Sequence, residues 1–153
     1  MKNALLLIAL GVAFTASAAS KPDFSGTWAF NPSKSKNIGM MASVEYTSTI
    51  TQTAKLVVVQ DFTAFNGQKQ THETRYDLAG TPVPNESPMG EKAQTTSHWS
   101  RNKLITAWET EGAVAGTKVV RTETRYLSPD GKTMYVESVR ANKDPMVIAF
   151  DRK

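Results

Sequence analysis

The chain has 153 residues and no cysteine, which excludes disulfide bonds, thiol catalysis and thiolate metal sites. Its 18 basic and 14 acidic residues leave a formal net charge of +4, a mild excess that is spread along the chain without a Lys/Arg cluster. The sequence therefore predicts no nucleic-acid-binding surface.

The first element in chain order has the layout of a secretory signal peptide. One positive charge precedes an apolar run over residues 4–14, and a stretch of small residues follows it. An apolar run of this length is too short to cross a bilayer, which needs about 20 residues. Small residues fit cleavage after Ala18 or Ala19, of which Ala19 is preferred. We therefore expect a signal peptide over residues 1–19 and one secreted or periplasmic domain over residues 20–153, with no integral membrane segment.

Beyond the leader the sequence shows no sustained helical periodicity and alternates strand-forming segments with turn signals. Nine strands are predicted, over residues 24–30, 44–52, 55–65, 68–78, 91–100, 103–111, 117–127, 132–141 and 146–152. Turns such as Asn66-Gly67 are short and join antiparallel neighbours. Residues 81–90 contain three prolines and are predicted to form a rim loop, as are residues 31–41. The predicted fold is all-β, an antiparallel up-and-down meander closed into a barrel of 8–10 strands.

Side chains alternate across a strand, so assigning charged residues to the outer face places their neighbours inside. A weak repeat, in which residues 73–76 recur as residues 123–126, helps to align the strands, although chance similarity between Thr-rich strands is an alternative. The aromatic residues predicted on the inner face are Tyr46, Phe62, Tyr76, Trp99, Trp108 and Tyr126. The polar residues predicted there are His72, Ser48, Thr74, Thr95, Ser97, Thr106, Thr122 and Thr124. The residues assigned outward include Asp61, Glu123 and Arg125.

This mixed inner face does not suit a dry core, because each unpaired buried hydroxyl costs about 1 to 3 kcal/mol. It predicts a cavity that holds water or a ligand. An alternative stays open, in which threonine simply suits strands and several of the assigned directions are wrong. With inverted directions, Arg75 and Arg125 would lie inside the barrel as anchors for a carboxylate.

Gly26-Thr27-Trp28 on the first strand resembles the opening motif of the calycins, the group of lipocalins and fatty-acid-binding proteins. In that group the tryptophan plugs the closed end of a barrel and a late basic residue packs on it. The resemblance implies a lipocalin-like barrel with a structural contact between Trp28 and Arg152. The run over residues 23–36 also resembles an uncharacterised family of exported bacterial proteins that share a G-T-W opening and an N-P-x-K-S continuation, here residues 31–35. Residues 98–104 loosely match a hairpin common in fatty-acid-binding-like barrels. Avidins also open with Gly-x-Trp, but the rest of their biotin site has no match here.

The function predicted from the mixed interior and the resemblance is binding of a small amphipathic or hydrophobic molecule, such as a lipid. The predicted ligand-binding residues are Tyr46, Phe62, His72, Thr74, Tyr76, Trp99, Trp108, Thr124 and Tyr126. No metal site or cofactor is expected, because neither His72 nor His98 has a metal-ligating neighbour at the required spacing. No catalytic residue is predicted, since the sequence has no nucleophile elbow and no phosphate loop. Two other functions stay open: a module that binds envelope proteins through its long loops, and a small barrel enzyme or haem-type protein that uses His72.

Overall fold

The computed structural model describes residues 20–87 and 90–153, so the predicted signal peptide over residues 1–19 lies outside the described residues. The strands are β1 (Gly26–Phe30), β2 (Glu45–Gln52), β3 (Leu56–Phe65), β4 (Gln68–Asp77), β5 (Val83–Glu86), β6 (Lys92–Ser100), β7 (Lys103–Glu111), β8 (Lys118–Leu127), β9 (Thr133–Val139) and β10 (Met146–Arg152). Two short 3-10 helices, η1 (Pro32–Lys34) and η2 (Gly39–Ser43), lie between β1 and β2. Neither these nor any other helix in the described residues is long and apolar enough to cross a membrane.

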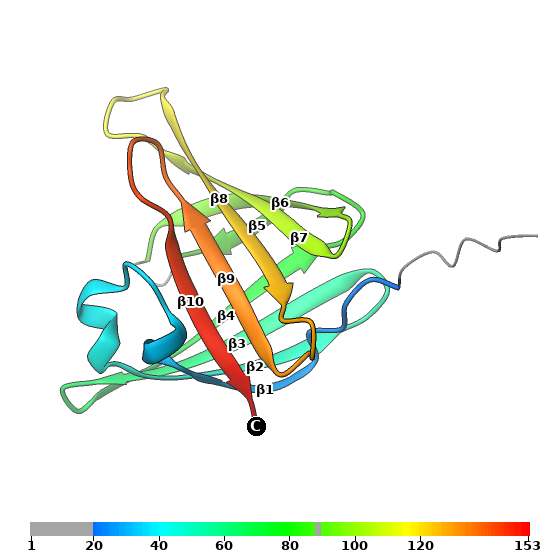
Figure 1. Cartoon of the computed structure of the whole chain (residues 1–153). Coiled ribbons are helices and arrows are strands. Elements are labelled where there is room, and N and C mark those ends of the chain that lie inside the picture. The colour runs from blue at the N-terminus through cyan, green and yellow to red at the C-terminus, as the bar shows by residue number, and fades with distance from the viewer. Residues whose placement is uncertain (1–19, 88–89) are drawn as a thin grey trace, which may run out of the picture.

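The strands form one antiparallel sheet in the order β4-β3-β2-β1-β10-β9-β8-β7-β6-β5. Because β1 pairs with both β2 and β10, the two ends of the described chain meet in the middle of the sheet. The sheet curls until its outer strands β4 and β5 come into contact, which makes a nearly closed barrel (Figure 1). The predicted all-β meander of 8–10 strands is confirmed.

Two segments differ from the sequence-based prediction. The first strand begins at Gly26, because Phe24 leaves the sheet and is completely buried beneath the barrel. The predicted loop over residues 81–90 contains the short strand β5, which pairs with β6. Pro84 is tolerated there because β5 is the last strand of the sheet and needs ladder hydrogen bonds on one side only.

Side chains point as predicted in β2, β4, β6 and β7. The residues predicted inside on these strands and found buried are Ser48, Ile50, Thr74, Tyr76, Thr95, Ser97, Leu104, Thr106 and Trp108. Tyr46 and His72 also face inward, where they line the interior cavity described below. The charged positions were therefore a valid guide on β2, β4 and β7, and the alignment of the repeat was a valid guide on β6.

The predicted directions in β3 are wrong. Val57 and Val59 are buried and Asp61 faces the interior, so Phe62 points outward with 39% of its surface exposed. The first four residues of β3 are all apolar, so polar and apolar residues do not alternate there and the pattern does not indicate which side chains point inward. The prediction then relied on Asp61 as an outward marker, and this carboxyl group lies in a polar interior instead.

The predicted directions in β8 are also wrong. Glu123 and Arg125 are buried with 8% and 6% of their surface exposed, so Thr122, Thr124 and Tyr126 point outward. The physical reason is that the two charged side chains form an ion pair with each other inside the barrel. A charge that has a buried partner no longer marks a solvent-facing position.

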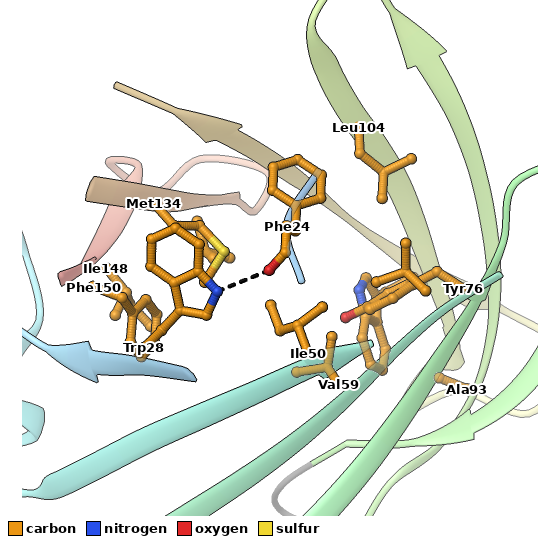
Figure 2. Packing of buried hydrophobic residues seen from close by; sticks show 13 residues of the cluster. Phe24, Trp28, Ile50, Val59, Tyr76, Ala93, Leu104, Met134, Ile148 and Phe150 are labelled. Carbon is orange, nitrogen blue, oxygen red and sulfur yellow. Dashed lines mark hydrogen bonds between the residues drawn. The ribbon is translucent and has the colours of Figure 1, made fainter. Parts of the chain in front are cut away.

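Apolar side chains close one end of the barrel, which we call the floor (Figure 2). Trp28 and Phe24 are completely buried there, and Trp28 Nε1 donates a 2.8 Å hydrogen bond to the carbonyl oxygen of Phe24. Trp99 lies on the inner side of β6 and stacks on Phe24 with ring centroids 5.8 Å apart. Trp99 is therefore part of the floor, and the prediction that it lines the ligand cavity is wrong, because the segment before β1 covers it.

The predicted contact between Arg152 and Trp28 is present. The guanidinium carbon of Arg152 lies 4.1 Å from the centre of the Trp28 ring, and its Nη1 donates a 2.8 Å hydrogen bond to the carbonyl oxygen of Ser25. Gly26 is needed beside this contact, since its φ is +126° and a Cβ there would come within 2.9 Å of Arg152 Nη1. The glycine and tryptophan of the opening motif thus have structural roles at the floor.

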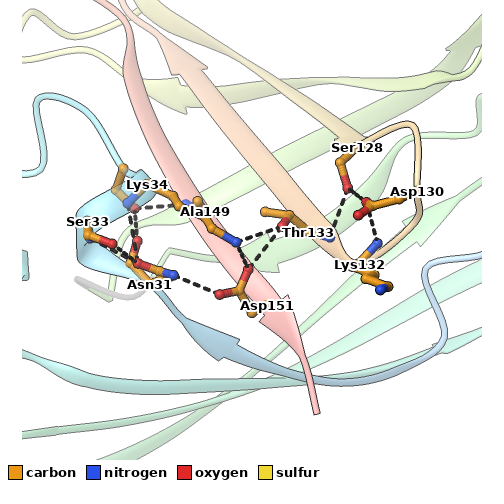
Figure 3. A network of polar contacts seen from close by, with 10 residues as sticks. Asn31, Ser33, Lys34, Ser128, Asp130, Lys132, Thr133, Ala149 and Asp151 are labelled. Carbon is orange, nitrogen blue, oxygen red and sulfur yellow. Dashed lines mark hydrogen bonds and ion pairs between the residues drawn. The ribbon is translucent and has the colours of Figure 1, made fainter.

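The segment after β1 is fastened to β10 by a polar network (Figure 3). The Asn31 side chain accepts hydrogen bonds from the backbone of η1 and donates one of 2.7 Å to Asp151 Oδ2. Lys34 Nζ lies 2.7 Å from Asp151 Oδ1, and the hydrogen bonds from Lys34 and Asn31 lower the pKa of Asp151. The asparagine and lysine of the N-P-x-K-S segment therefore fix the position of the loop between β1 and β2.

Candidate functional site

A cavity of about 820 Å³ lies inside the barrel above the floor. The inner faces of β2, β3, β4, β7, β8, β9 and β10 make its wall, and Met41 and Gly90 from the two long loops border it. Its volume falls within the range of small-molecule sites, which is about 300 to 1,000 Å³. The predicted residues that line it are Tyr46, His72, Thr74, Tyr76 and Trp108.

The remaining predicted site residues are placed elsewhere. Phe62, Thr124 and Tyr126 lie on the outer face, and Trp99 lies in the floor. The cavity wall carries charged residues that the sequence analysis had assigned outward or had not singled out, namely Asp61, Glu86, Glu91, Arg121, Glu123, Arg125 and Arg140. One signal for part of this set was present in the sequence: Glu123 and Arg125 are two residues apart on one strand, so they share a face and can pair.

The ion pair of Glu123 and Arg125 is the most deeply buried charged feature of the cavity. Arg125 Nη2 lies 3.1 Å from Glu123 Oε1, and the two side chains are 7% and 11% exposed. Tyr76 donates a 3.3 Å hydrogen bond to the same Glu123 oxygen, and its ring lies 5.7 Å from the Arg125 guanidinium carbon. The pair is thus held by contacts from β4 and β8 together.

These contacts set the protonation states of the pair and its neighbour. Burial alone would lower the pKa of Arg125, but the charge of Glu123 and the nearby Tyr76 raise it above its usual range. Burial and the charge of Glu123 raise the pKa of Tyr76 well above its ordinary value. At neutral pH the guanidinium is therefore charged and the phenol is neutral.

Asp61 forms a second polar centre on the opposite wall. Tyr46 donates a 2.9 Å hydrogen bond to Asp61 Oδ2, and Asp61 lies in register between Ser48 of β2 and His72 of β4. Burial raises the pKa of Asp61, and the Ser48 hydroxyl, the charge of Arg125 and the Tyr46 hydroxyl offset part of this effect. The charged form of Asp61 is therefore less favourable in the empty cavity than in water.

Several polar atoms of the wall lack a hydrogen-bond partner within the described part of the chain. The buried nitrogens in this state are His72 Nε2, Trp108 Nε1, Arg121 Nε and Arg125 Nε. Arg121 nevertheless packs on Trp108, with its guanidinium carbon 4.7 Å from the ring centre. Because an unpaired buried polar group costs about 1 to 3 kcal/mol, the cavity favours contents that supply hydrogen-bonding atoms.

The seam between β4 and β5 is joined by one side chain. Asn85 Oδ1 accepts a 3.0 Å hydrogen bond from the Arg75 backbone N–H, and Asn85 Nδ2 donates one of 2.8 Å to the Arg75 carbonyl oxygen. Asn85 also donates a 2.7 Å bond to Thr95 Oγ1. An amide side chain thus replaces a backbone ladder pair at the only seam of the described barrel. Arg75 itself lies outside, in an ion pair with Glu73.

We expect Asn85→Ala to lower the free energy of unfolding by about 1 to 3 kcal/mol, the sum of two or three ordinary hydrogen bonds. The seam should open more often, so the Arg75 amide should exchange its hydrogen faster, which NMR measures. Gln94→Ala, an exposed change on β6, is the matched control and should alter neither quantity. Unchanged exchange at Arg75 in the Asn85 variant would show that the seam closes without this side chain.

Metal chemistry has no residue cluster to support it in the described chain, where no group of three His, Asp or Glu side chains could hold an ion. The side chains of the wall offer hydrogen bonding, charge pairing and aromatic contact. These interactions suit the retention and orientation of a bound molecule.

Solved structures with the same architecture are similar to this chain over most of its length. The REP1-NXSQ fatty acid transporter is 16% identical, with a TM-score of 0.66 over 84% of this chain and 95% of that chain. Human cRBP IV is 15% identical, with a TM-score of 0.65 over 86% of this chain and 99% of that chain. Apo lipid binding protein 8 of Caenorhabditis elegans is 12% identical, with a TM-score of 0.66 over 85% of this chain and 95% of that chain.

At these identities the likeness concerns the fold alone, and it confirms the predicted antiparallel barrel with the architecture of fatty-acid-binding proteins. No model of a known protein family and no curated protein matches the sequence. The similarity of residues 31–35 to a family of exported bacterial proteins thus stays a prediction.

Proposed function

We propose that this protein binds a small amphipathic molecule inside its barrel and carries it outside the cytoplasm, as a secreted or periplasmic protein. The observation that carries the proposal is the cavity of about 820 Å³ whose wall combines aromatic rings with buried polar atoms that lack partners. An apolar ligand body would pack on the rings, and its polar end would supply the missing hydrogen bonds. The printed names of the structural neighbours, a fatty acid transporter and a lipid binding protein among them, agree with such a ligand.

The proposal describes a binder rather than an enzyme. His72 is the candidate base from the sequence, and it lines the cavity with its Nε2 unpartnered in the described residues. In that same part of the chain it forms no ion pair with a carboxylate that would orient it for proton transfer. We therefore assign His72 a role in hydrogen bonding to the ligand. The location rests on the leader-like layout of residues 1–19.

The test is a titration of the purified protein with C12 amphiphiles by isothermal calorimetry, alongside native mass spectrometry of the protein as isolated. We expect Thr74→Trp, which adds a ring inside the cavity, to weaken binding by more than about tenfold, or 1.4 kcal/mol. Thr96→Trp adds the same ring at an exposed position of β6 and should leave binding unchanged. Equal affinities in the two variants, or no binding by the wild type, would overturn the proposal.

A further inference from the structure

The charge of Arg125 is already paired. Its Nη2 lies 3.1 Å from Glu123 Oε1, both side chains are nearly inaccessible, and Tyr76 adds a third contact to the same pair. An incoming carboxylate would have to compete with Glu123 for this guanidinium. The deepest cation of the cavity is therefore a poor anchor for a fatty-acid head group.

Asp61 is a carboxyl group of the inner wall that Arg125 does not neutralise by direct pairing. It accepts a hydrogen bond from Tyr46 but forms no ion pair within the part of the chain that the structure describes. The whole wall shows the same excess, because four carboxyl groups line the cavity and three guanidinium groups face them. Counted over these side chains, the wall holds one more acidic group than guanidinium groups.

The atoms around Asp61 match the donors of an ammonium group. Ser48, Asp61 and His72 are in register on β2, β3 and β4, so their side chains form one row across the inner face. Asp61 Oδ1 and His72 Nε2 are buried and have no geometric hydrogen-bond partner among the described residues, and the Ser48 hydroxyl lies beside Asp61 on the neighbouring strand. A hydroxyl oxygen, a carboxylate oxygen and an imidazole nitrogen that carries no hydrogen can each accept a hydrogen bond, and a primary ammonium has three N–H donors.

We propose that the head group of the ligand is a cation, an alkylammonium group held by the row of Ser48, Asp61 and His72, and not a carboxylate. This inference rests on the proposed function, since it names the ligand class of the same cavity. Binding of the cation would also relieve the cost of the lone buried carboxylate, because an opposite charge nearby favours its ionised form. The alkyl chain of the ligand would extend along the aromatic wall of Tyr76 and Trp108.

The test compares three probes with the same chain, dodecylammonium, 1-dodecanol and dodecanoate, titrated at neutral pH below their micelle concentrations. We expect dodecylammonium to bind at least about tenfold more tightly than dodecanoate. Asp61→Asn should weaken dodecylammonium binding by about 10- to 100-fold, the loss expected for one hydrogen bond between charged groups. The same variant should change the affinity for 1-dodecanol by less than about threefold, and it should bind dodecanoate more tightly than the wild type does.

Glu73→Gln is the matched control, because it removes one negative charge from the outer face of β4, the strand next to Asp61. It should leave the affinity for each of the three probes unchanged. Asp61→Asn keeps the shape of the side chain, and its thermal unfolding temperature should equal or exceed that of the wild type. Tighter binding of dodecanoate than of dodecylammonium, or an Asp61→Asn variant with unchanged ammonium affinity, would overturn the inference while leaving the proposed function intact. Failure of all three probes to bind would instead reject the proposed function together with the inference.

Discussion

Glu123→Ala is expected to lower the free energy of unfolding by about 3 to 5 kcal/mol, because it leaves Arg125 charged and without its partner inside the barrel. An arginine guanidinium does not lose its proton in proteins, so deprotonation cannot relieve the cost of the unpaired charge. A domain of this size has a total stability of about 5 to 15 kcal/mol, so this one change removes a large part of it. Urea unfolding followed by tryptophan fluorescence measures the loss.

Two controls separate the buried charge from the general effect of losing a glutamate. Glu109 pairs with Lys118 on the surface, and Glu109→Ala should cost less than about 1 kcal/mol. The double variant Glu123→Leu/Arg125→Met removes both charges and should recover most of the stability that the single variant loses. A single variant as stable as the wild type would show that Asp61 takes over as the partner of Arg125.

Trp28→Ala is expected to lower the free energy of unfolding by about 3 to 5 kcal/mol, the usual cost of removing a large buried aromatic side chain. The ring is completely buried, its Nε1 donates to Phe24, and Arg152 packs on its face. The variant leaves a void in the floor and releases the segment before β1. Differential scanning calorimetry should record a corresponding fall in the melting temperature.

Arg152→Met tests which part of this arrangement matters. It keeps the packing of Trp28 and removes the cation above the ring, so it should cost about 0.5 to 2 kcal/mol. A smaller loss of unfolding free energy in Trp28→Ala than in Arg152→Met would contradict the role of the ring as the plug of the barrel.

The repeated motif shows where side-chain directions could and could not be inferred. Residues 73–76 and 123–126 have the same sequence, yet Thr74 and Tyr76 face inward on β4 while Glu123 and Arg125 face inward on β8. Identical residues alternate identically along a strand, so the sequence of the motif carries no information on which set lies inside. Each register was decided by the neighbouring strand: Thr74 lies opposite Val59, and Glu123 lies opposite Thr106.

The same ambiguity explains which site residues were found. Thr74 and Trp108 lie on strands where several charged residues alternate with uncharged ones, and Tyr46 follows Glu45, the single charge of β2. The structure places all three at the cavity, as their predicted directions require. Asp61 and Arg125 were missed because the rule that charges face solvent assumes an apolar interior. That assumption fails in a barrel whose interior is itself polar.

The sequence by itself determined the class of the fold. Its short turns and strand-forming segments are local features, and they were sufficient to predict a meander barrel. The contact of Trp28 with Arg152 at its plugged end was implied by the resemblance to the calycins. Only the tertiary structure decided the character of the cavity, because the pairing of Glu123 with Arg125 and the unmatched Asp61 depend on which faces of β3 and β8 turn inward. A one-residue change of register exchanges the two faces of a strand, and this choice is made by the sum of its contacts across the barrel rather than by the strand alone.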